Sequence, residues 1–259
     1  MDSSFQVIIP ARYASTRLPG KALLDIGGKP LIQHVYDSAS ASNAGQVLIA
    51  TDDKRIESAA RAFNAEVELT SSGHTSGTDR ITEVVTRLGE ADETIVVNVQ
   101  GDEYGLPAAI INQVADILRT NTQKSISTLC VKIDDPAELN DPNVVKVIFD
   151  RDNTAIYFSR SPIPWHEQDS VELPCQPFRH IGIYAYRAGF LKTYSRLPPC
   201  PLEASEKLEQ LRAIYHGYKI HVEQACEDCG IGIDTQEDLD LARRTADKLT
   251  ASVGNSALG

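Results

Sequence analysis

The segment FQVIIPARYASTRLPGK, residues 5–21, is the most informative part of the sequence, because an apolar run passes directly into a cationic loop. The run at 5–9 is rich in β-branched residues, which is typical of a buried strand. Pro10 and Pro19 lack a backbone donor and Gly20 permits a tight turn, so the residues after the strand are expected to form a loop.

The loop carries three cations beside small hydrogen-bonding side chains. Arg12, Arg17 and Lys21 follow the predicted strand, and the hydroxyls of Ser15 and Thr16 lie between them in sequence. Such a set suits a polyphosphate, and open α/β sheets bind ligands at the carboxyl ends of their strands. A solvated basic loop is the alternative, but the Pro/Gly framing and the preceding strand favour phosphate binding.

The acidic composition limits the partners of the chain. The 259 residues include 36 acidic and 25 basic side chains, a net charge of −11, which argues against nucleic acid or an anionic membrane as a general partner. No apolar run approaches the roughly 20 residues of a membrane span, and the opening MDSSFQ lacks the features of a signal peptide. Five cysteines, an odd number, do not suggest a disulfide framework, so we expect a reducing cytoplasm and ordinary thiols at Cys226 and Cys229.

Apolar runs alternate with helical patterns in the first half of the chain. Buried strands are predicted at 5–9, 46–50 and 94–99, and a helical face follows each of them. This alternation predicts an α/β fold with a mostly parallel central sheet. The three helices are expected near residues 30–39, 56–63 and 107–118.

Strands follow one another more quickly in the second half. We therefore expect a smaller antiparallel sub-domain around 130–200. It would be added to a single α/β domain that spans 1–250, with 251–259 as a flexible tail. The strand-like runs in question are 126–133, 144–149 and 181–186.

Two helix starts are predicted near the carboxyl end of the chain. Ser205 is expected to cap a helix that closes near Gly217. Thr235 and Asp238 resemble a capping box with Asp in place of Glu, which would open the last helix. A final strand, KIHVE, is predicted between them at 219–223.

A carboxylate follows the third apolar run, in the string NVQGDE. Asp102 is therefore placed beside the phosphate loop, where it suits Mg²⁺ bound to a triphosphate. Gly101 lets the backbone approach a ligand closely, and Gln100 can contact a base or ribose. A plain turn after a strand is the alternative.

The loop HTSGTDR, residues 74–80, leads into a helix. Hydroxyls and backbone amides at a helix start can read the edge of a pyrimidine, and Arg80 can reach a carbonyl or phosphate. An ordinary helix start is the alternative. The same alternative applies to Asp234 in GIGIDT, which directly precedes Thr235.

The string IIPARYASTRLPGK closely resembles the beginning of the 3-deoxy-manno-octulosonate (Kdo) cytidylyltransferases, also called CMP-Kdo synthetases. Motifs similar to those of this family follow across residues 7–240: HTSGTDR, VNVQGDE, FSRSPIPW, RHIGIYAY, KLEQLRA and GIGIDT. The resemblance implies a Rossmann-like, GT-A-type nucleotide-diphosphosugar transferase fold that assembles as a homodimer through the added sub-domain. The implied reaction is CTP plus Kdo giving CMP-Kdo and pyrophosphate, for lipopolysaccharide biosynthesis. Tyr104 and Gly105 depart from the family, which usually has Pro and an aliphatic residue there.

The resemblance also implies roles for individual residues. Asp102 and Asp234 would hold Mg²⁺ and act in catalysis together with Arg12 and Lys21. Nucleotide contacts are implied for Arg12, Ser15, Thr16, Arg17, Lys21, Ser76, Gly77, Arg80 and Gln100.

Contacts with the sugar are implied on the other motifs. Arg160 suits the sugar carboxylate, because a planar guanidinium pairs with it through two hydrogen bonds. His180 and Tyr184 are candidate partners of sugar hydroxyls, and Glu209 and Gln210 would face the sugar if the apolar side of their helix faces the core. A satisfied buried histidine and solvated helix positions are the respective alternatives.

Three rival functions remain open from the sequence. The same chemistry can act on another acid sugar, such as 8-amino-Kdo or a sialic acid. A uridylyl or thymidylyl transferase for neutral sugars typically has a first loop richer in glycine. A nucleotide-binding protein without catalysis would not need both Asp102 and Asp234.

Overall fold

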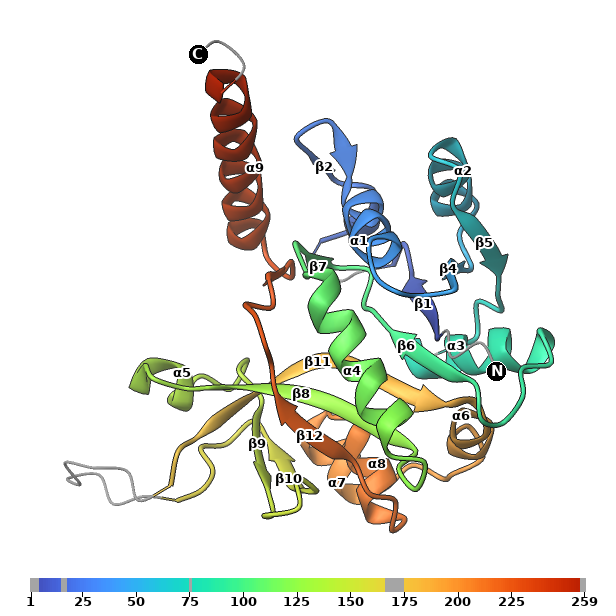
Figure 1. Ribbon diagram of the computed structural model, residues 1–259, viewed down its shortest axis with the longest axis vertical. Coiled ribbons are helices and arrows are strands. Elements are labelled where there is room, and N and C mark those ends of the chain that lie inside the picture. The colour runs from blue at the N-terminus through green and yellow to red at the C-terminus, as the bar shows by residue number, and fades with distance from the viewer. Residues whose placement is uncertain (1–4, 15–17, 75, 166–174, 257–259) are drawn as a thin grey trace. The chain divides into compact units, whose positions relative to one another are not determined.

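The computed structural model describes residues 5–14, 18–74, 76–165 and 175–256 (Figure 1). The fold is mixed α/β, with a large, mostly parallel central sheet and small antiparallel sheets, which confirms the predicted fold class. The chain divides into two compact units. The first unit comprises Met1–Gly89, Asn98–Asn112 and Glu227–Gly259, and the second comprises Glu90–Val97 and Gln113–Cys226.

Three parallel strands form the sheet core of the first unit. β1 (Gln6–Ala11) pairs with β4 (Gln46–Thr51), and β4 pairs with β5 (Glu66–Leu69). The β1 side chains of Ile8 and Ile9 are fully buried, as expected for a strand covered on both faces. The strands at 5–9 and 46–50 are thereby confirmed, whereas β5 was not predicted from the sequence.

A helix follows each of these strands in sequence, and the helices after β1 and β4 are those that the alternation predicted. Pro30 directly precedes α1 in an extended conformation, so its missing backbone donor falls outside the helix. Ser76 caps α3 by accepting a hydrogen bond from the Asp79 amide, so the predicted helix start at 74–80 is confirmed. The three helices are α1 (Leu31–Ser40), α2 (Lys54–Ala62) and α3 (Gly77–Arg87).

Two elements run across the sequence boundaries between the units. They are β6 (Ile95–Asn98) and α4 (Ala108–Thr120), which match the strand and the helix predicted there. Directly after β6, the Val99 amide donates to the Ile8 carbonyl at 3.4 Å. The chain therefore leaves β6 beside β1, as the βαβ pattern requires.

Short ribbons and a long helix complete the first unit. The carboxyl-terminal helix opens with the predicted capping box: the Thr235 amide donates to Asp238 Oδ2 at 2.8 Å, and the Asp238 amide donates to Thr235 Oγ1 at 3.2 Å. The remaining elements are η1 (Lys21–Leu23), β2 (Asp25–Ile26), β3 (Lys29–Pro30), β7 (Glu103–Tyr104), β13 (Ile231–Gly232) and α9 (Gln236–Ser256).

The second unit has the antiparallel character expected of this region. β8 (Ile126–Lys132) pairs antiparallel with β11 (Phe178–Arg187) and parallel with β12 (His221–Gln224). β9 (Lys146–Phe149) pairs antiparallel with both β11 and β10 (Ala155–Ser159). Its helices are α5 (Pro136–Asn140), α6 (Ala188–Tyr194), α7 (Pro201–Glu206) and α8 (Gln210–Tyr215).

The prediction that Ser205 caps a helix is wrong. Ser205 lies in the last turn of α7, which begins one residue after Cys200 because Pro201 suits a first helical position. Lys207 adopts a left-handed conformation with φ of 57° and ends α7, so the segment forms two short helices. The second of these, α8, is preceded by Glu209.

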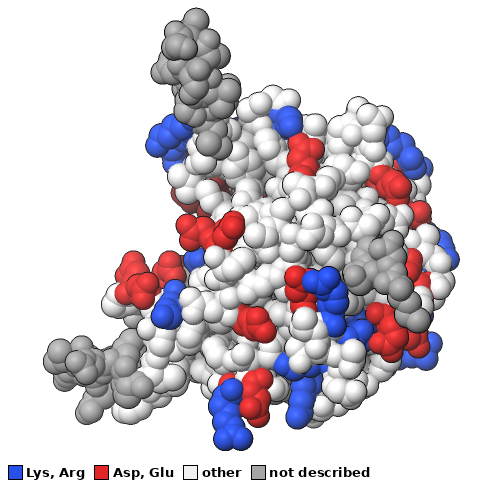
Figure 2. Space-filling model, in the orientation of Figure 1, with Lys and Arg blue, Asp and Glu red and all other residues white. Residues whose placement is uncertain are grey.

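Charged side chains of both signs are interspersed on the face shown in Figure 2. Among the described residues, no helix combines the length and the apolar character that a membrane span requires.

Candidate active site

Lys21 joins the two aspartates that the sequence singled out. Its Nζ lies 2.5 Å from Asp102 Oδ2 and 3.0 Å from Asp234 Oδ1. Burial lowers the pKa of Lys21, but the charges and hydrogen bonds of Asp102 and Asp234 outweigh it and raise that pKa above its ordinary value. The lysine is therefore a fixed cation between two carboxylates that come from distant parts of the sequence.

Glycine brings the Asp102 loop onto the end of β1. A Cβ atom at Gly101 would lie 3.0 Å from the Pro10 carbonyl oxygen and 3.5 Å from Ala11 Cβ. A side chain at this position would have to displace the β1 backbone by a few tenths of an ångström, which favours glycine. The close contact of Gly101 is with β1, and its approach to a ligand stays a prediction.

The cationic loop after β1 is closed by its own backbone. The Gly20 amide donates to the Tyr13 carbonyl at 3.0 Å, and the Arg55 guanidinium lies 3.2 Å from the centre of the Tyr13 ring. Arg12 is exposed at the start of this loop. The predicted contacts of Ser15, Thr16 and Arg17 lie outside the described residues. Arg55 was not predicted from the sequence, because nothing in its own segment signals a contact with Tyr13.

The amino-terminal end of α3 lies against the same end of β1. A Cβ atom at Gly77 would lie 3.2 Å from Pro10 Cγ and 3.6 Å from Gln100 Oε1. The structure therefore brings together Gly77 and Gln100, two of the predicted nucleotide-binding residues. Ser76, next to Gly77, uses its hydroxyl as the helix cap.

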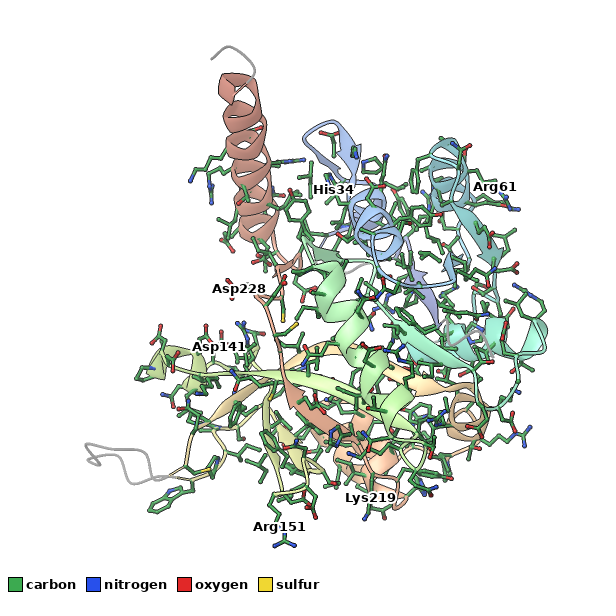
Figure 3. All side chains as sticks on the ribbon, viewed as in Figure 1. His34, Arg61, Asp141, Arg151, Lys219 and Asp228 are labelled. Atoms are coloured by element: carbon green, nitrogen blue, oxygen red, sulfur yellow. The ribbon has the colours of Figure 1, made fainter. Side chains whose placement is uncertain are left out.

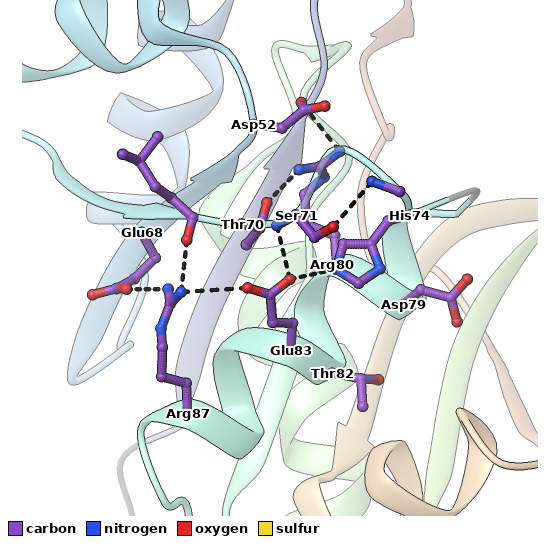
Figure 4. Close-up of polar contacts among 12 residues, drawn as sticks. Asp52, Glu68, Thr70, Ser71, His74, Asp79, Arg80, Thr82, Glu83 and Arg87 are labelled. Carbon is purple, nitrogen blue, oxygen red and sulfur yellow. Dashed lines mark hydrogen bonds and ion pairs between the residues drawn. The ribbon is translucent and has the colours of Figure 1, made fainter.

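Arg80 lies inside the protein rather than at its surface. It is only 4% exposed, and its guanidinium pairs with Asp52 at 3.2 Å and donates to the Thr70 hydroxyl (Figure 4). Because both contacts are with the protein itself, Arg80 is better suited to hold α3 against the ends of the strands than to bind a phosphate directly. No pattern around Asp52 indicated that it would be the partner of Arg80.

Glu83 ties the loop before α3 to the helix itself. It accepts from the Ser71 amide at 2.9 Å and lies 2.5 Å from His74 Nε2 (Figure 4). Burial raises the pKa of Glu83, but the Ser71 amide and His74 outweigh it and lower the pKa. These contacts hold the entry to α3 in place, and Glu83 was not predicted from the sequence.

In the second unit, Arg160 is held by backbone carbonyls. Its Nε donates to the Glu206 carbonyl at 2.8 Å, and its Nη1 donates to the Pro142 carbonyl at 2.9 Å. The Glu206 carboxylate accepts from the Arg160 amide at 2.9 Å and from the Ser159 hydroxyl at 2.6 Å. The guanidinium is thus oriented before any ligand arrives.

A fully buried lysine supports the Arg160 backbone. Lys146 Nζ donates to the carbonyl oxygens of Asp141 at 2.9 Å, Val144 at 2.5 Å and Arg160 at 2.6 Å. Burial lowers the pKa of Lys146, which nearby Asp141 opposes. This residue was not predicted from the sequence, although a lysine inside the apolar run VVKVIF was a usable signal.

His180 and Tyr184 lie together on β11. The rings are 5.3 Å apart, and His180 Nε2 is 2.9 Å from the Thr128 hydroxyl. Shielding from water lowers the pKa of His180 to about 3, so its imidazole is neutral near pH 7. Burial raises the pKa of the Tyr184 hydroxyl well above its ordinary value, and a hydrogen bond with Thr128 opposes this shift.

Glu209 and Gln210 lie at the start of α8. Both are half-buried, and the Glu209 carbonyl accepts from the Tyr194 hydroxyl at 2.8 Å. The apolar face of the segment does face the core, because Leu208 and Leu211 are buried. The sugar contact of Glu209 and Gln210 stays a prediction.

Comparison with known proteins agrees with these features. Residues 6–220 match the family model described as Cytidylyltransferase. The chain is 50% identical over 258 residues to the 3-deoxy-manno-octulosonate cytidylyltransferase of Pasteurella multocida (strain Pm70), which covers 95% of this chain and 100% of that protein. It is 54% identical over 245 residues to the protein of the same name from Vibrio cholerae serotype O1 (strain M66-2), covering 93% of this chain and 97% of the relative.

A solved structure is similar over the same extent. It is the CMP:2-keto-3-deoxy-manno-octonic acid synthetase complexed with CTP, with a TM-score of 0.88, 40% identity, and coverage of 95% of this chain and 99% of the other. Sequence and structure thus agree over almost the whole of both chains. The chain therefore belongs to the cytidylyltransferase family and, within it, to the 3-deoxy-manno-octulosonate cytidylyltransferases.

Proposed function

We propose that the protein transfers the cytidylyl group of CTP to Kdo and releases pyrophosphate. The observation that carries the proposal is the convergence of Lys21, Asp102 and Asp234 in a chain of this family. The relatives named above have this reaction in their names, and the similar solved structure is a complex with CTP.

The reaction forms one bond and breaks another at the α-phosphorus of CTP. The anomeric oxygen of Kdo attacks this phosphorus and its proton passes to water. The bond between the α-phosphorus and the oxygen that bridges the α- and β-phosphates of CTP breaks, and pyrophosphate leaves with that oxygen. Phosphorus chemistry of this kind depends mainly on positioning and on neutralising charge. Arg12 and Lys21 supply that charge beside the triphosphate, together with Arg17, which lies outside the described residues.

The donor set around Lys21 fits Mg²⁺. Asp102 and Asp234 both lie within 3.0 Å of the Lys21 ammonium, so they converge on the position of one cation, and carboxylate oxygens are the ligands that Mg²⁺ prefers. Mg²⁺ between them would take the place of that ammonium, and the flexible lysine side chain would turn toward the phosphates. Over the described part of the chain, no group of three or more His, Cys, Asp or Glu side chains forms a metal site. Two carboxylates suit an ion that keeps waters and takes phosphate oxygens. When bound, Mg²⁺ would neutralise charge on the phosphates and polarise the α-phosphate. Asp102 and Asp234 would hold it.

The second unit carries the residues that we assign to the sugar. The oriented guanidinium of Arg160 suits the carboxylate of an ulosonic acid. Tyr184 lies beside His180 on β11, with ring centres 5.3 Å apart, so we assign both to the same part of the sugar. Neutral His180 can exchange a hydrogen bond with a sugar hydroxyl but cannot add a positive charge. Glu209 and Gln210 are assigned to the sugar by the family resemblance alone.

A homodimer in a reducing cytoplasm is part of the proposal. The apolar side chains of Ile156 and Trp165 in the second unit are 54% and 84% exposed, which favours a contact with another surface. All five cysteines are free thiols. Light scattering after size exclusion would give the mass in solution, and a monomer at micromolar concentration would contradict the dimer.

The experiment that tests the function is pyrophosphate release with CTP and Mg²⁺. Kdo, 8-amino-Kdo and N-acetylneuraminate are offered separately, and we expect release with Kdo. Release only with another acid sugar would keep the reaction and change the substrate. If no sugar leads to pyrophosphate release while CTP still binds, the protein is a nucleotide-binding protein without catalysis.

A further inference from the structure

A two-stranded ribbon connects the segments that carry the two aspartates. Its strands are β7 and β13, with Tyr104 opposite Ile231 and Glu103 opposite Gly232. The ladder continues one step further, because the Ile233 amide donates to the Asp102 carbonyl at 3.0 Å. Asp234 is the next residue. The ribbon therefore ends at the two carboxylates themselves.

Gly230 lies where the ribbon begins, in unusually close contact with the opposite strand. It has φ of 74°, and a Cβ atom there would lie 2.4 Å from the Tyr104 carbonyl oxygen and 2.8 Å from the Gly105 carbonyl carbon. These neighbours are backbone atoms, which cannot rotate away as a side chain can. Any side chain at Gly230 would force the two strands apart.

The opposite strand is fixed from behind. The buried Tyr104 ring packs edge-on against His34 of α1 with ring centres 5.1 Å apart, and His34 Nε2 is 2.8 Å from the Ile26 carbonyl oxygen (Figure 3 labels His34). Strand β7 therefore has little room to retreat. A change at Gly230 would be absorbed by β13, which leads directly into Asp234.

We propose that Gly230 is a positioning residue that sets the separation of Asp102 and Asp234, with Tyr104 as the anchor of the opposite strand. This inference rests on the proposed function, in which the two carboxylates hold Mg²⁺. The tolerance is small, because both carboxylates lie within 3.0 Å of Lys21 Nζ, and functional groups need to be held within about 0.5 Å of their productive positions.

A second glycine serves as a control for the effect of a left-handed backbone conformation by itself. Gly28, in the turn between β2 and β3, has φ of 85°, and a Cβ atom there would meet no other atom within 4 Å. Gly28→Ala imposes the backbone strain alone, whereas Gly230→Ala adds the collision with β7. If the backbone conformation were the whole reason for glycine, the two substitutions would behave alike.

The test compares the wild-type protein with Gly230→Ala, Gly28→Ala and Asp234→Asn. Mn²⁺ binding in the presence of CTP is measured by electron paramagnetic resonance, and exchange of the Ile233 amide is measured without metal. For Gly230→Ala we expect the Mn²⁺ dissociation constant to rise by about tenfold or more, equal to about 1.4 kcal/mol, and Ile233 to exchange faster. A displacement of about 1 Å would lower kcat by on the order of a hundredfold. Gly28→Ala should leave Mn²⁺ binding and Ile233 exchange unchanged.

Wild-type Mn²⁺ affinity and Ile233 protection in Gly230→Ala would overturn the inference. Equal Mn²⁺ binding by the wild type and Asp234→Asn would instead refute the proposed metal role, while Ile233 exchange would still report on the ribbon. If Gly230→Ala does not fold, Tyr104→Leu replaces it, because it removes the ring contact with His34 and keeps the ribbon backbone. A severalfold weaker Mn²⁺ affinity in Tyr104→Leu supports the anchor, and an unchanged affinity overturns it.

Discussion

Replacing Asp102 by Asn is the sharpest single test of the candidate active site. The substitution keeps the shape of the side chain, and the amide oxygen can still accept a hydrogen bond from Lys21 Nζ, which lies 2.5 Å from Asp102 Oδ2. Only one negative charge is lost. Lys21 keeps Asp234 at 3.0 Å, so the ammonium stays in place.

The expected loss follows from the number of charges at the site. Removing one of two carboxylates takes away half of the negative charge directed at the proposed metal. Losing one preorganised electrostatic contact to a transition state typically costs about 2.7–4 kcal/mol, or on the order of 10²–10³ in kcat. The stability of the fold should change far less, because this ion pair is partly exposed.

The assay is pyrophosphate release at saturating CTP and Kdo over a range of Mg²⁺ concentrations, with thermal unfolding measured in parallel. Asp37→Asn is the matched control. Asp37 Oδ2 also pairs with a lysine, Lys29 Nζ at 2.7 Å, but both of these side chains are about half exposed. A near-normal kcat in Asp102→Asn, with the control also normal, would refute the role of Asp102 in holding the metal.

Three further predictions concern the second unit. Arg160→Lys should raise KM for Kdo by about tenfold or more while leaving KM for CTP unchanged, because lysine cannot make the paired hydrogen bonds of a guanidinium; steady-state kinetics with each substrate varied would show an equal rise in both if the assignment is wrong. Lys146→Met should lower the free energy of unfolding by on the order of 3 kcal/mol, because three carbonyl oxygens lose their charged donor; urea denaturation measures this against the exposed control Lys29→Met, and equal midpoints would contradict it. The pKa of His180 is lowered to about 3 in the folded protein, below its unfolded value of about 6.5, so its contribution to stability is complete above about pH 6.5 and is lost as the pH falls from there toward 3. His180→Gln should therefore lose less free energy of unfolding than the wild type between about pH 7 and about pH 5. Urea denaturation at both pH values measures this, and an equal loss in the two proteins would contradict it.

Much of the first unit could be predicted from local pattern. The run QVIIPA is apolar enough to specify a buried strand by itself, and Thr235 with Asp238 forms the expected capping box. β5 escaped prediction because the string EVEL carries two glutamates and its strand character depends on pairing with β4. Local pattern also misplaced the cap at Ser205, since it does not show that Lys207 turns the chain left-handed.

The candidate site was harder to predict than the fold, because its contacts join segments far apart in sequence. Family motifs pointed to Asp102 and Asp234, but nothing in either segment indicated that Lys21 would lie between them. Lys146 and Glu206 support Arg160 through hydrogen bonds to and from the backbone, which leave no pattern in the sequence. Such supporting residues become visible only when the tertiary structure is known.

Two loops of the first unit meet at Pro10, and this has a consequence for protein engineering. Gly77 approaches the Pro10 ring and Gly101 approaches the Pro10 carbonyl, each at a distance that leaves no room for a methyl group without displacement. Effects of substitutions at such touching positions are not additive. A library that aims to alter nucleotide preference should therefore vary positions 10, 77 and 101 jointly. If one position is varied at a time, only side chains that fit the two original neighbours can be selected.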